Sequence, residues 1–331
     1  MKGLSLFTQV LVCVTTIPLL ACQSSPDLRR NQGQLAGKDV VDLRITEEPY
    51  YQQRKMDKKM DALISYLERQ TGLNIEYVPS INYAHSHHLL LSGEVDLLWS
   101  GSLGALKVMS GPDPAQPIAV ESKSFANVLL ANNRVLPEIQ GQLNSPRPLQ
   151  SLKDHGVIFG ARSSGSSFLT PVLEMQREGV SLDDLSRCIH ESHHEKRALI
   201  LADSEAYSFA WLPGSVKDPM KFVPPQVQSK LKVVWTSPVK RNYFILAGSH
   251  LPTVEERADT YKVQQALLAL GKRGEDGQAL LSKLGIYGFE RPDQAQGRLR
   301  KDSGRWLANE ELLQLADQLN QNPACGAQHA G

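Results

Sequence analysis

The residues with the clearest chemical potential form a run rich in serine and glycine, 160–168, which reads GARSSGSSF. The apolar segment that leads into it, 157–161, is typical of a buried strand, and the residues from Phe168 onward are typical of a helix. The first turn of a helix has unpaired N–H groups and a partial positive charge, and serines add hydroxyl donors. We therefore predict a binding site for a tetrahedral oxyanion here. The same pattern also fits a plain serine N-cap at a flexible turn.

The run does not carry a catalytic motif. No Gly-Lys-Ser/Thr follows it, so it is not a P-loop, and it contains no Gly-x-Ser-x-Gly nucleophile elbow. Serine and histidine are abundant, but none has the sequence context of a nucleophile. We therefore expect a binding protein that is not an enzyme and that needs no cofactor.

Clustered histidines suggest metal binding as a second possible function, because neutral imidazole is a common ligand for transition metals. Only Glu191 and Glu195 stand near them as further ligands, and both clusters fall at predicted helix starts, where polar residues are normal. We expect no metal site and keep a zinc- or nickel-binding protein as an alternative. The histidines are His85, His87, His88, His190, His193 and His194.

The N-terminus has the pattern of an export signal. Residues 1–21 carry one cation, Lys2, before an apolar stretch, and this stretch ends at Cys22 in a sequence that resembles a lipobox. We predict a cleaved signal peptide, a lipid on Cys22 and a flexible tether over 22–37. The protein would then lie at the periplasmic face of a bacterial membrane.

Two cysteines remain beyond the predicted lipidation site. Cys188 and Cys325 could pair in an oxidising compartment, but one falls in a predicted loop and the other in the tail. We favour two separate thiols. No Cys-x-x-Cys is present, which excludes a zinc ribbon or a thioredoxin-like site.

Length and charge narrow the function further. The chain has 331 residues, 36 Lys and Arg against 35 Asp and Glu, and 41% hydrophobic residues. This length suits about two domains with their own cores. The formal net charge of +1 gives no bulk attraction to nucleic acid, so we expect no nucleic-acid partner.

Strand and helix patterns alternate ahead of the serine run. Apolar residues at helical spacing follow the first strand, and Gly72 ends that helix. Strand, helix, strand, helix, strand is a βαβαβ unit, which implies a parallel sheet. The expected strands are 40–45, 73–78 and 95–99, and the apolar helix face is Met56, Met60, Leu63, Ile64 and Leu67.

A second series of strands and helices follows. A stretch rich in Pro, Asn, Gly and Ser, 132–148, separates its first strand from the rest and carries no expected element. Residues 321–331 read as disordered. The expected strands are 126–131, 157–161, 207–211, 232–235 and 243–247. One helix is expected to begin at Phe168, and others are expected over 196–202, 261–270 and 279–284. A last amphipathic helix is expected in the tail, with the leucines Leu312, Leu313, Leu315 and Leu319.

Four motifs in order resemble the phosphonate-, phosphate- or phosphite-binding components of ABC transporters. The resemblance covers roughly residues 40–290. The first two motifs are Pro49-Tyr50 and the Gly-Glu-x-Asp strand with its small-residue loop over 93–102. The third is the family's Ser-x-Ser-Gly-x-Leu-x-Pro loop, which aligns with 164–171 with Ser167 in place of the glycine, and the fourth is His194-Glu195 heading the stretch that ends at Tyr207.

The resemblance implies a two-lobed α/β fold of the periplasmic-binding-protein (type II-like) kind, with a hinge and a ligand cleft between the lobes. Lobe one would be 38–126 plus 240–295, lobe two 127–239, and 296–331 a C-terminal helix and tail. The implied ligand residues are Tyr50, Trp99 and Ser100 from lobe one, and Ser164, Gly165, Ser166, Ser167, His194 and Tyr207 from lobe two.

Two departures from the family bear on the ligand. Tyr207 stands where the family has an Asp, and a tyrosine offers no full negative charge to a ligand amine, such as that of an aminoalkylphosphonate. Arg241 lies near the predicted hinge and could reach an anion, although we favour a solvated surface cation. Arg162, beside the serine run, has the same two interpretations.

The resemblance also implies the role. The protein would capture a small oxyanion, a phosphonate or phosphate-type compound, and present it to an ABC permease. A lipoprotein that reports the ligand to a membrane sensor kinase is the alternative with the same fold.

Overall fold

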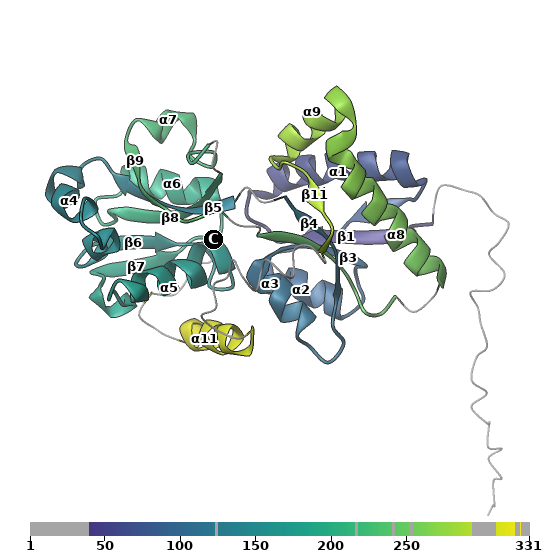
Figure 1. The fold of residues 1–331 in the computed structure, drawn as a ribbon, viewed down its shortest axis with the longest axis horizontal. Coiled ribbons are helices and arrows are strands. Elements are labelled where there is room, and N and C mark those ends of the chain that lie inside the picture. The colour runs from purple at the N-terminus through teal and green to yellow at the C-terminus, as the bar shows by residue number, and fades with distance from the viewer. Residues whose placement is uncertain are drawn as a thin grey trace, which may run out of the picture. The chain divides into compact units, whose positions relative to one another are not determined.

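The strands fall into two sheets, and each sheet is covered by helices on both faces (Figure 1). The computed structural model describes residues 40–122, 125–215, 218–239, 242–251, 254–292, 309–321 and 325. The predicted signal peptide and tether, Cys22 and Arg241 lie outside the described residues. No helix within the described ranges is both long and apolar enough to cross a membrane.

The first sheet contains the predicted βαβαβ unit. Its central strand β1 pairs in parallel with β2 and β3, which confirms that part of the prediction. β10 then pairs antiparallel with β3 and β4, an arrangement that local sequence patterns do not reveal. In sheet order the strands are β11 (Phe289–Glu290), β4 (Gln116–Glu121), β10 (Tyr243–Ala247), β3 (Leu97–Gly101), β1 (Leu43–Glu47) and β2 (Ile75–Tyr77).

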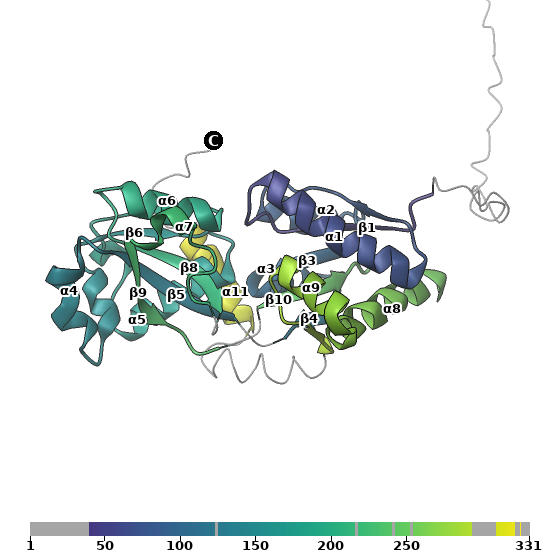
Figure 2. The ribbon, with the colours of Figure 1, turned by 90° about the horizontal axis from the view of Figure 1, so that it is seen from above.

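Helices on both faces bury the first sheet. α1 (Gln53–Thr71) buries the whole predicted apolar face and ends at Gly72, whose φ of 74° suits a glycine C-cap. α1 packs beside α8 (Val254–Ala269) and α9 (Gly274–Leu284) on one face (Figure 2). The other face is covered by α2 (Tyr83–Leu91) and α3 (Ser102–Met109).

The second sheet is mixed. β6 pairs in parallel with β7 and β8, and β5 pairs antiparallel with β8 and β9. Ala126, assigned to lobe one from the sequence, lies in β5 of this sheet. In sheet order the strands are β7 (Arg187–His190), β6 (Gly156–Phe159), β8 (Phe209–Ser215), β5 (Phe125–Asn132) and β9 (Leu231–Thr236).

The helices of the second sheet include one in the stretch 132–148, where no element was expected. α4 (Leu136–Leu143) forms there because Ile139 is fully buried and a proline at the start suits a first helical turn. α6 (His194–Asp203) and α7 (Pro225–Gln228) cover the opposite face. Below, lobe one means the first sheet with its helices, and lobe two the second sheet with its helices.

The C-terminal segment corrects two expectations, that Cys188 and Cys325 are separate thiols and that residues 321–331 are disordered throughout. Helix α11 (Asn309–Gln321) buries Ala316 and Leu319 in the core of lobe two, and Cys325 beyond it forms a disulfide with Cys188 of β7. The two cysteines are 137 residues apart, so their pairing depends on where α11 packs, which spacing does not disclose. Arg162, beside the serine run, is partly buried and donates to the backbone oxygens of Leu319 and Cys325.

Candidate functional site

The serine run lies at the carboxyl end of β6 and has a shape fixed by its own hydrogen bonds. Gly165–Leu169 forms a π-helical turn that leads into α5 (Thr170–Arg177). Ser164 stands at its N-cap, and its Oγ accepts the N–H of Ser167 at 3.1 Å. The N–H of Gly160 donates to the carbonyl of Ser167 at 2.9 Å. The amide of Ser167 is therefore in use inside the loop.

Those hydroxyls are buried, and one has no partner. Ser164, Ser166 and Ser167 are only 6%, 5% and 1% exposed. The Oγ atoms of Ser164 and Ser166 lie 3.4 Å apart. The Oγ of Ser167 has no hydrogen-bond partner among the described residues. A buried hydroxyl without a partner is costly, so it marks a position where a ligand oxygen would fit.

His194, the first residue of α6, brings a second unpaired group. Its backbone N–H donates to the carbonyl of Tyr50 at 3.1 Å, and its ring stacks on the Tyr50 ring at a centroid distance of 5.1 Å. Burial, followed by the nearby Arg197, holds the pKa of His194 well below its usual range, so the imidazole is neutral. Its Nδ1 has no partner in the described part of the chain.

Arg197 lies one helical turn further along α6 and was missed by the sequence analysis. Its side chain is fully buried, and its Nη1 donates to the carbonyl of Trp211 at 2.6 Å. Burial lowers the pKa of Arg197 to about 10, so it stays protonated at neutral pH. The signal available in the sequence is its spacing of three from His194, which puts both side chains on one helix face.

Tyr50 and Trp99 belong to a buried network in lobe one. Lys59 of α1 donates to the hydroxyl of Tyr50 and forms an ion pair with Glu47. The ammonium of Lys59 also lies 3.4 Å from the centroid of the Trp99 ring, and the indole N–H donates to Glu121 at 3.0 Å. Trp99 packs in the hydrophobic core under α1, α8 and α9, and Lys59 lies over both its ring and that of Tyr50.

Ser100, predicted as a ligand residue, donates its hydroxyl to a carboxylate of its own chain. Its hydroxyl donates to Oε1 of Glu48 at 2.7 Å, and the N–H of Gly101 donates to Oε2 at 2.8 Å. His87 lies 2.9 Å from the same Oε1. Glu48 thus occupies the start of α3, the position at a helix N-terminus that favours negative charge.

The serine run and the start of α3 meet directly. A Cβ on Gly165 would stand 2.9 Å from Oγ of Ser102 and 3.1 Å from the backbone N of Leu103, so this approach requires glycine. The hydroxyl of Ser102 donates to Asn242 at 3.1 Å. Lys55 of α1 adds an ion pair with Glu195 of α6. Residues from both lobes therefore surround the run.

Tyr207 stands apart from the other predicted ligand residues. β8 runs parallel to β6 with Phe209 opposite Val157, which aligns Tyr207 with the residue just before β6 begins. The serine run follows the opposite end of β6, about 15 Å away at strand spacing. The structure brings together Tyr50, Gly165, the serines and His194. It leaves Tyr207 at the amino ends of β6 and β8, opposite the end where the serine run lies.

The clustered histidines have separate roles in the structure. His87 contacts Glu48, His190 bonds through Nδ1 to the carbonyl of Gly160 at 2.7 Å, and His193 contacts Glu191 at 3.0 Å. No group of three or more His, Cys, Asp or Glu side chains in the described ranges is arranged to hold a metal ion.

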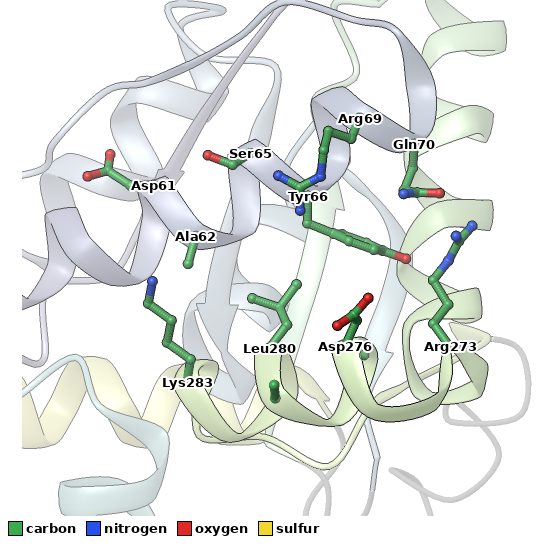
Figure 3. Close-up of a pocket in the computed structure, with 12 residues that line it drawn as sticks. Asp61, Ala62, Ser65, Tyr66, Arg69, Gln70, Arg273, Asp276, Leu280 and Lys283 are labelled. Atoms are coloured by element: carbon green, nitrogen blue, oxygen red, sulfur yellow. The ribbon is translucent and has the colours of Figure 1, made fainter.

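A polar groove of about 560 Å³ lies on lobe one between α1 and α9 (Figure 3). Tyr66 and Arg69 of α1 face Arg273, Asp276 and Lys283 across it. None of the predicted ligand residues lines this groove. It therefore provides an alternative location against which the serine run can be tested.

Comparisons with known proteins agree with this architecture. Residues 45–296 match the family described as "ABC transporter, phosphonate, periplasmic substrate-binding protein". The chain is 22% identical over 269 residues to the probable ABC transporter phosphite binding protein of Prochlorococcus marinus, covering 80% of this chain and 89% of that protein. It is 23% identical to the phosphonates-binding periplasmic protein of Escherichia coli, covering 74% of this chain and 70% of that protein.

Solved structures show the same fold. The Prochlorococcus marinus protein in complex with methylphosphonate superposes with a TM-score of 0.65 at 21% identity, covering 78% of this chain and 98% of that one. A binding protein component of an ABC phosphonate transporter from Pseudomonas aeruginosa gives a TM-score of 0.60 at 18% identity, with 84% and 94% covered. The fold is the α/β two-sheet periplasmic-binding-protein type II fold. The chain belongs to the family of periplasmic substrate-binding proteins of phosphonate ABC transporters, and its role is transport rather than catalysis.

Proposed function

We propose that this protein captures a small phosphorus oxyanion, a phosphonate or phosphate-type compound, at the serine run for delivery to its ABC permease. The observation that carries the proposal is the set of buried polar groups without partners at this place. Oγ of Ser167 and Nδ1 of His194 are both unpaired among the described residues. Relatives that bind phosphite or phosphonate support the choice of ligand class.

The proposed contacts follow from the geometry. The hydroxyls of Ser164, Ser166 and Ser167 would donate to ligand oxygens, with the π-helical turn 165–169 at the start of the helix adding its partial positive charge. His194 would donate through its ring, since a neutral imidazole carries one N–H. Tyr50 would cover the ligand from lobe one. The predicted contacts of Trp99, Ser100 and Tyr207 have no support of this kind.

Ligand entry would require the lobes to separate. The chain passes from the first sheet to the second after β4 and returns after β9, and crossings of this kind are suited to hinge motion. A third crossing leads from β11 to α11 on lobe two. Closure around the ligand would restore the contacts between the serine run and α3. We propose that the permease recognises this closed form.

A binding experiment tests the proposal. Thermal shift followed by isothermal titration would use phosphate, phosphite, methylphosphonate and sulfate on the purified protein, because a ligand of the folded state raises the melting temperature. We expect binding of a phosphorus oxyanion that Ser166→Ala weakens by about 1–3 kcal/mol. Ser186→Ala, an exposed serine of the same lobe, is the matched control and should bind like the wild type. Equal affinity in both variants would remove the serine run from the site.

We also propose that the protein is held at the membrane by a lipid on Cys22. The support is the apolar stretch that ends directly at this cysteine. Cys22→Ser should move the protein into the soluble periplasmic fraction. A variant that stays with the membrane fraction would show that the anchor lies elsewhere.

A further inference from the structure

The side chain of Arg197 is a buried cation, and two of its three guanidinium nitrogens are unpaired among the described residues. It is fully buried, and its Nη1 is bonded to the carbonyl of Trp211. Its Nε and Nη2 have no hydrogen-bond partner among the described residues. Burying a guanidinium without satisfying its donors is costly, and such groups are retained where something else completes them.

The two unused nitrogens form one edge of the guanidinium. Nε–H and the neighbouring N–H of Nη2 point in parallel, which is the arrangement that binds two oxygens of a carboxylate or phosphate group at once. The bond from Nη1 to Trp211 fixes the plane of the group. The open edge is therefore preorganised for a bidentate anion.

Arg197 lies beside the serine run. A Cβ on Gly160 would stand 2.8 Å from Nη1 of Arg197 and 3.3 Å from Oγ of Ser167, so both groups border the same point. Ser167 and His194 each contribute an unpaired atom of their own. Three unpaired buried groups from two elements thus gather at the end of β6.

The charge of Arg197 has no direct counterion in the described part of the chain. Glu191 acts on it from a distance, and that carboxylate is already engaged by His193 at 3.0 Å and Lys196 at 2.8 Å. Tyr83 and Tyr243 of lobe one also face it, and burial keeps the pKa of both phenols above their usual range, so they are uncharged. An anion at this place would be the missing partner.

We propose that Arg197 is a specificity-determining residue of the ligand site, whose Nε–Nη2 edge selects oxyanions with a doubly charged head group. The inference rests on the proposed function and names its ligand class more closely. A dianionic phosphonate or phosphate offers two charged oxygens to the guanidinium and leaves the third for the serine hydroxyls. A head group with one oxygen esterified keeps a single charge and loses part of this match.

The experiment compares methylphosphonate with its monomethyl ester by isothermal titration near pH 8. Arg197→Met removes both the positive charge and the Nε–Nη2 edge. Arg197→Lys keeps the positive charge but lacks the two parallel donors of that edge. We expect Arg197→Met to lose affinity for methylphosphonate by about tenfold to a hundredfold and to lose less for the ester. Arg197→Lys should fall between these two proteins. Arg177→Met, at an exposed arginine of α5, is the control and should match the wild type.

The outcomes separate this inference from the proposed function. If the wild type binds methylphosphonate and a folded Arg197→Met variant binds it equally well, Arg197 is a structural residue and the inference is overturned while the proposed function stands. If Arg197→Met does not fold, an unchanged dianion-to-ester ratio in Arg197→Lys overturns the inference in the same way. If the wild type ignores phosphorus oxyanions but binds sulfate through Arg197, the phosphorus ligand is wrong and the arginine site stands. If the wild type binds none of these anions, both the inference about Arg197 and the proposed function are overturned.

Discussion

The two lobes differ in how their buried ionisable groups are paired. In lobe one, Lys59 is paired with Glu47, and Glu48 receives hydrogen bonds from Ser100 and Gly101. In lobe two, Arg197 and His194 are buried with atoms that have no partner among the described residues. The charges of the first set are paired within the chain, although Oε2 of Glu47 lacks a hydrogen-bond partner among the described residues. The charge of Arg197 has no ion-pair partner in the same part of the chain, so the second set needs an added group to pair it.

This difference separates stability from binding. A paired set contributes to folding because removing one member strands the other in a dry environment. An unpaired set raises the free energy of the empty protein, and a ligand recovers that cost when it binds. Lobe one should therefore respond to mutation mainly in stability, and lobe two mainly in affinity.

The largest effect should come from breaking the paired set. Lys59→Met leaves Glu47 buried without its partner, and we expect the free energy of unfolding to fall by about 3–5 kcal/mol. Urea denaturation measures it. Lys262→Met removes an exposed lysine paired with Asp259 and should cost at most about 1 kcal/mol. A loss at Lys59 no larger than at Lys262 would mean that the buried pair does not stabilise lobe one.

The disulfide should come next. Cys325→Ser releases the C-terminal segment from β7, and we expect a loss of about 2–4 kcal/mol because the bridge closes a long loop. Reducing the wild type with dithiothreitol before urea denaturation should give a matching loss. If reduction leaves the unfolding midpoint unchanged, α11 holds to lobe two by packing alone.

A pair of serines in lobe two sharpens the contrast. Ser167→Ala should weaken ligand binding by about 1–3 kcal/mol and leave the stability of the empty protein unchanged or higher, because its hydroxyl is unpaired. Ser151→Ala is the matched control, since Ser151 is equally buried but donates to the carbonyl of Pro148 at 2.7 Å. It should lose about 1 kcal/mol of stability and no affinity. Identical behaviour of the two serines would contradict the account.

A further prediction concerns the pH dependence of stability. Burial raises the pKa of Glu121 to about 7, from 4.5 as the ordinary value. The folded state then binds a proton more tightly than the unfolded state, so this residue lowers stability as pH rises from 4.5 through 7, by at most about 1.4 kcal/mol per pH unit. Glu121→Gln should remove that slope. Urea denaturation of both proteins across this range measures the difference, and parallel curves would show that Glu121 does not titrate there.

Local patterns predicted the parts of the molecule that local forces decide. The α1 face and the βαβαβ unit followed from apolar spacing, and the serine run followed from its place between a strand and a helix. The disulfide, the partners of Arg162 and the distance of Tyr207 depend on which segments meet in space, and spacing does not record that. Arg197 was missed because an arginine on an amphipathic helix reads as solvated until burial is known.

A crystal structure of the protein with methylphosphonate would show whether the ligand completes the unpaired groups of lobe two. We expect the phosphonate oxygens within hydrogen-bond distance of Ser167 Oγ and of the open Nε–Nη2 edge of Arg197. We also expect the polar groups around Glu48 and Lys59 to keep the partners described above. A phosphonate bound in the groove between α1 and α9, with Ser167 and Arg197 still unpaired, would contradict the first expectation.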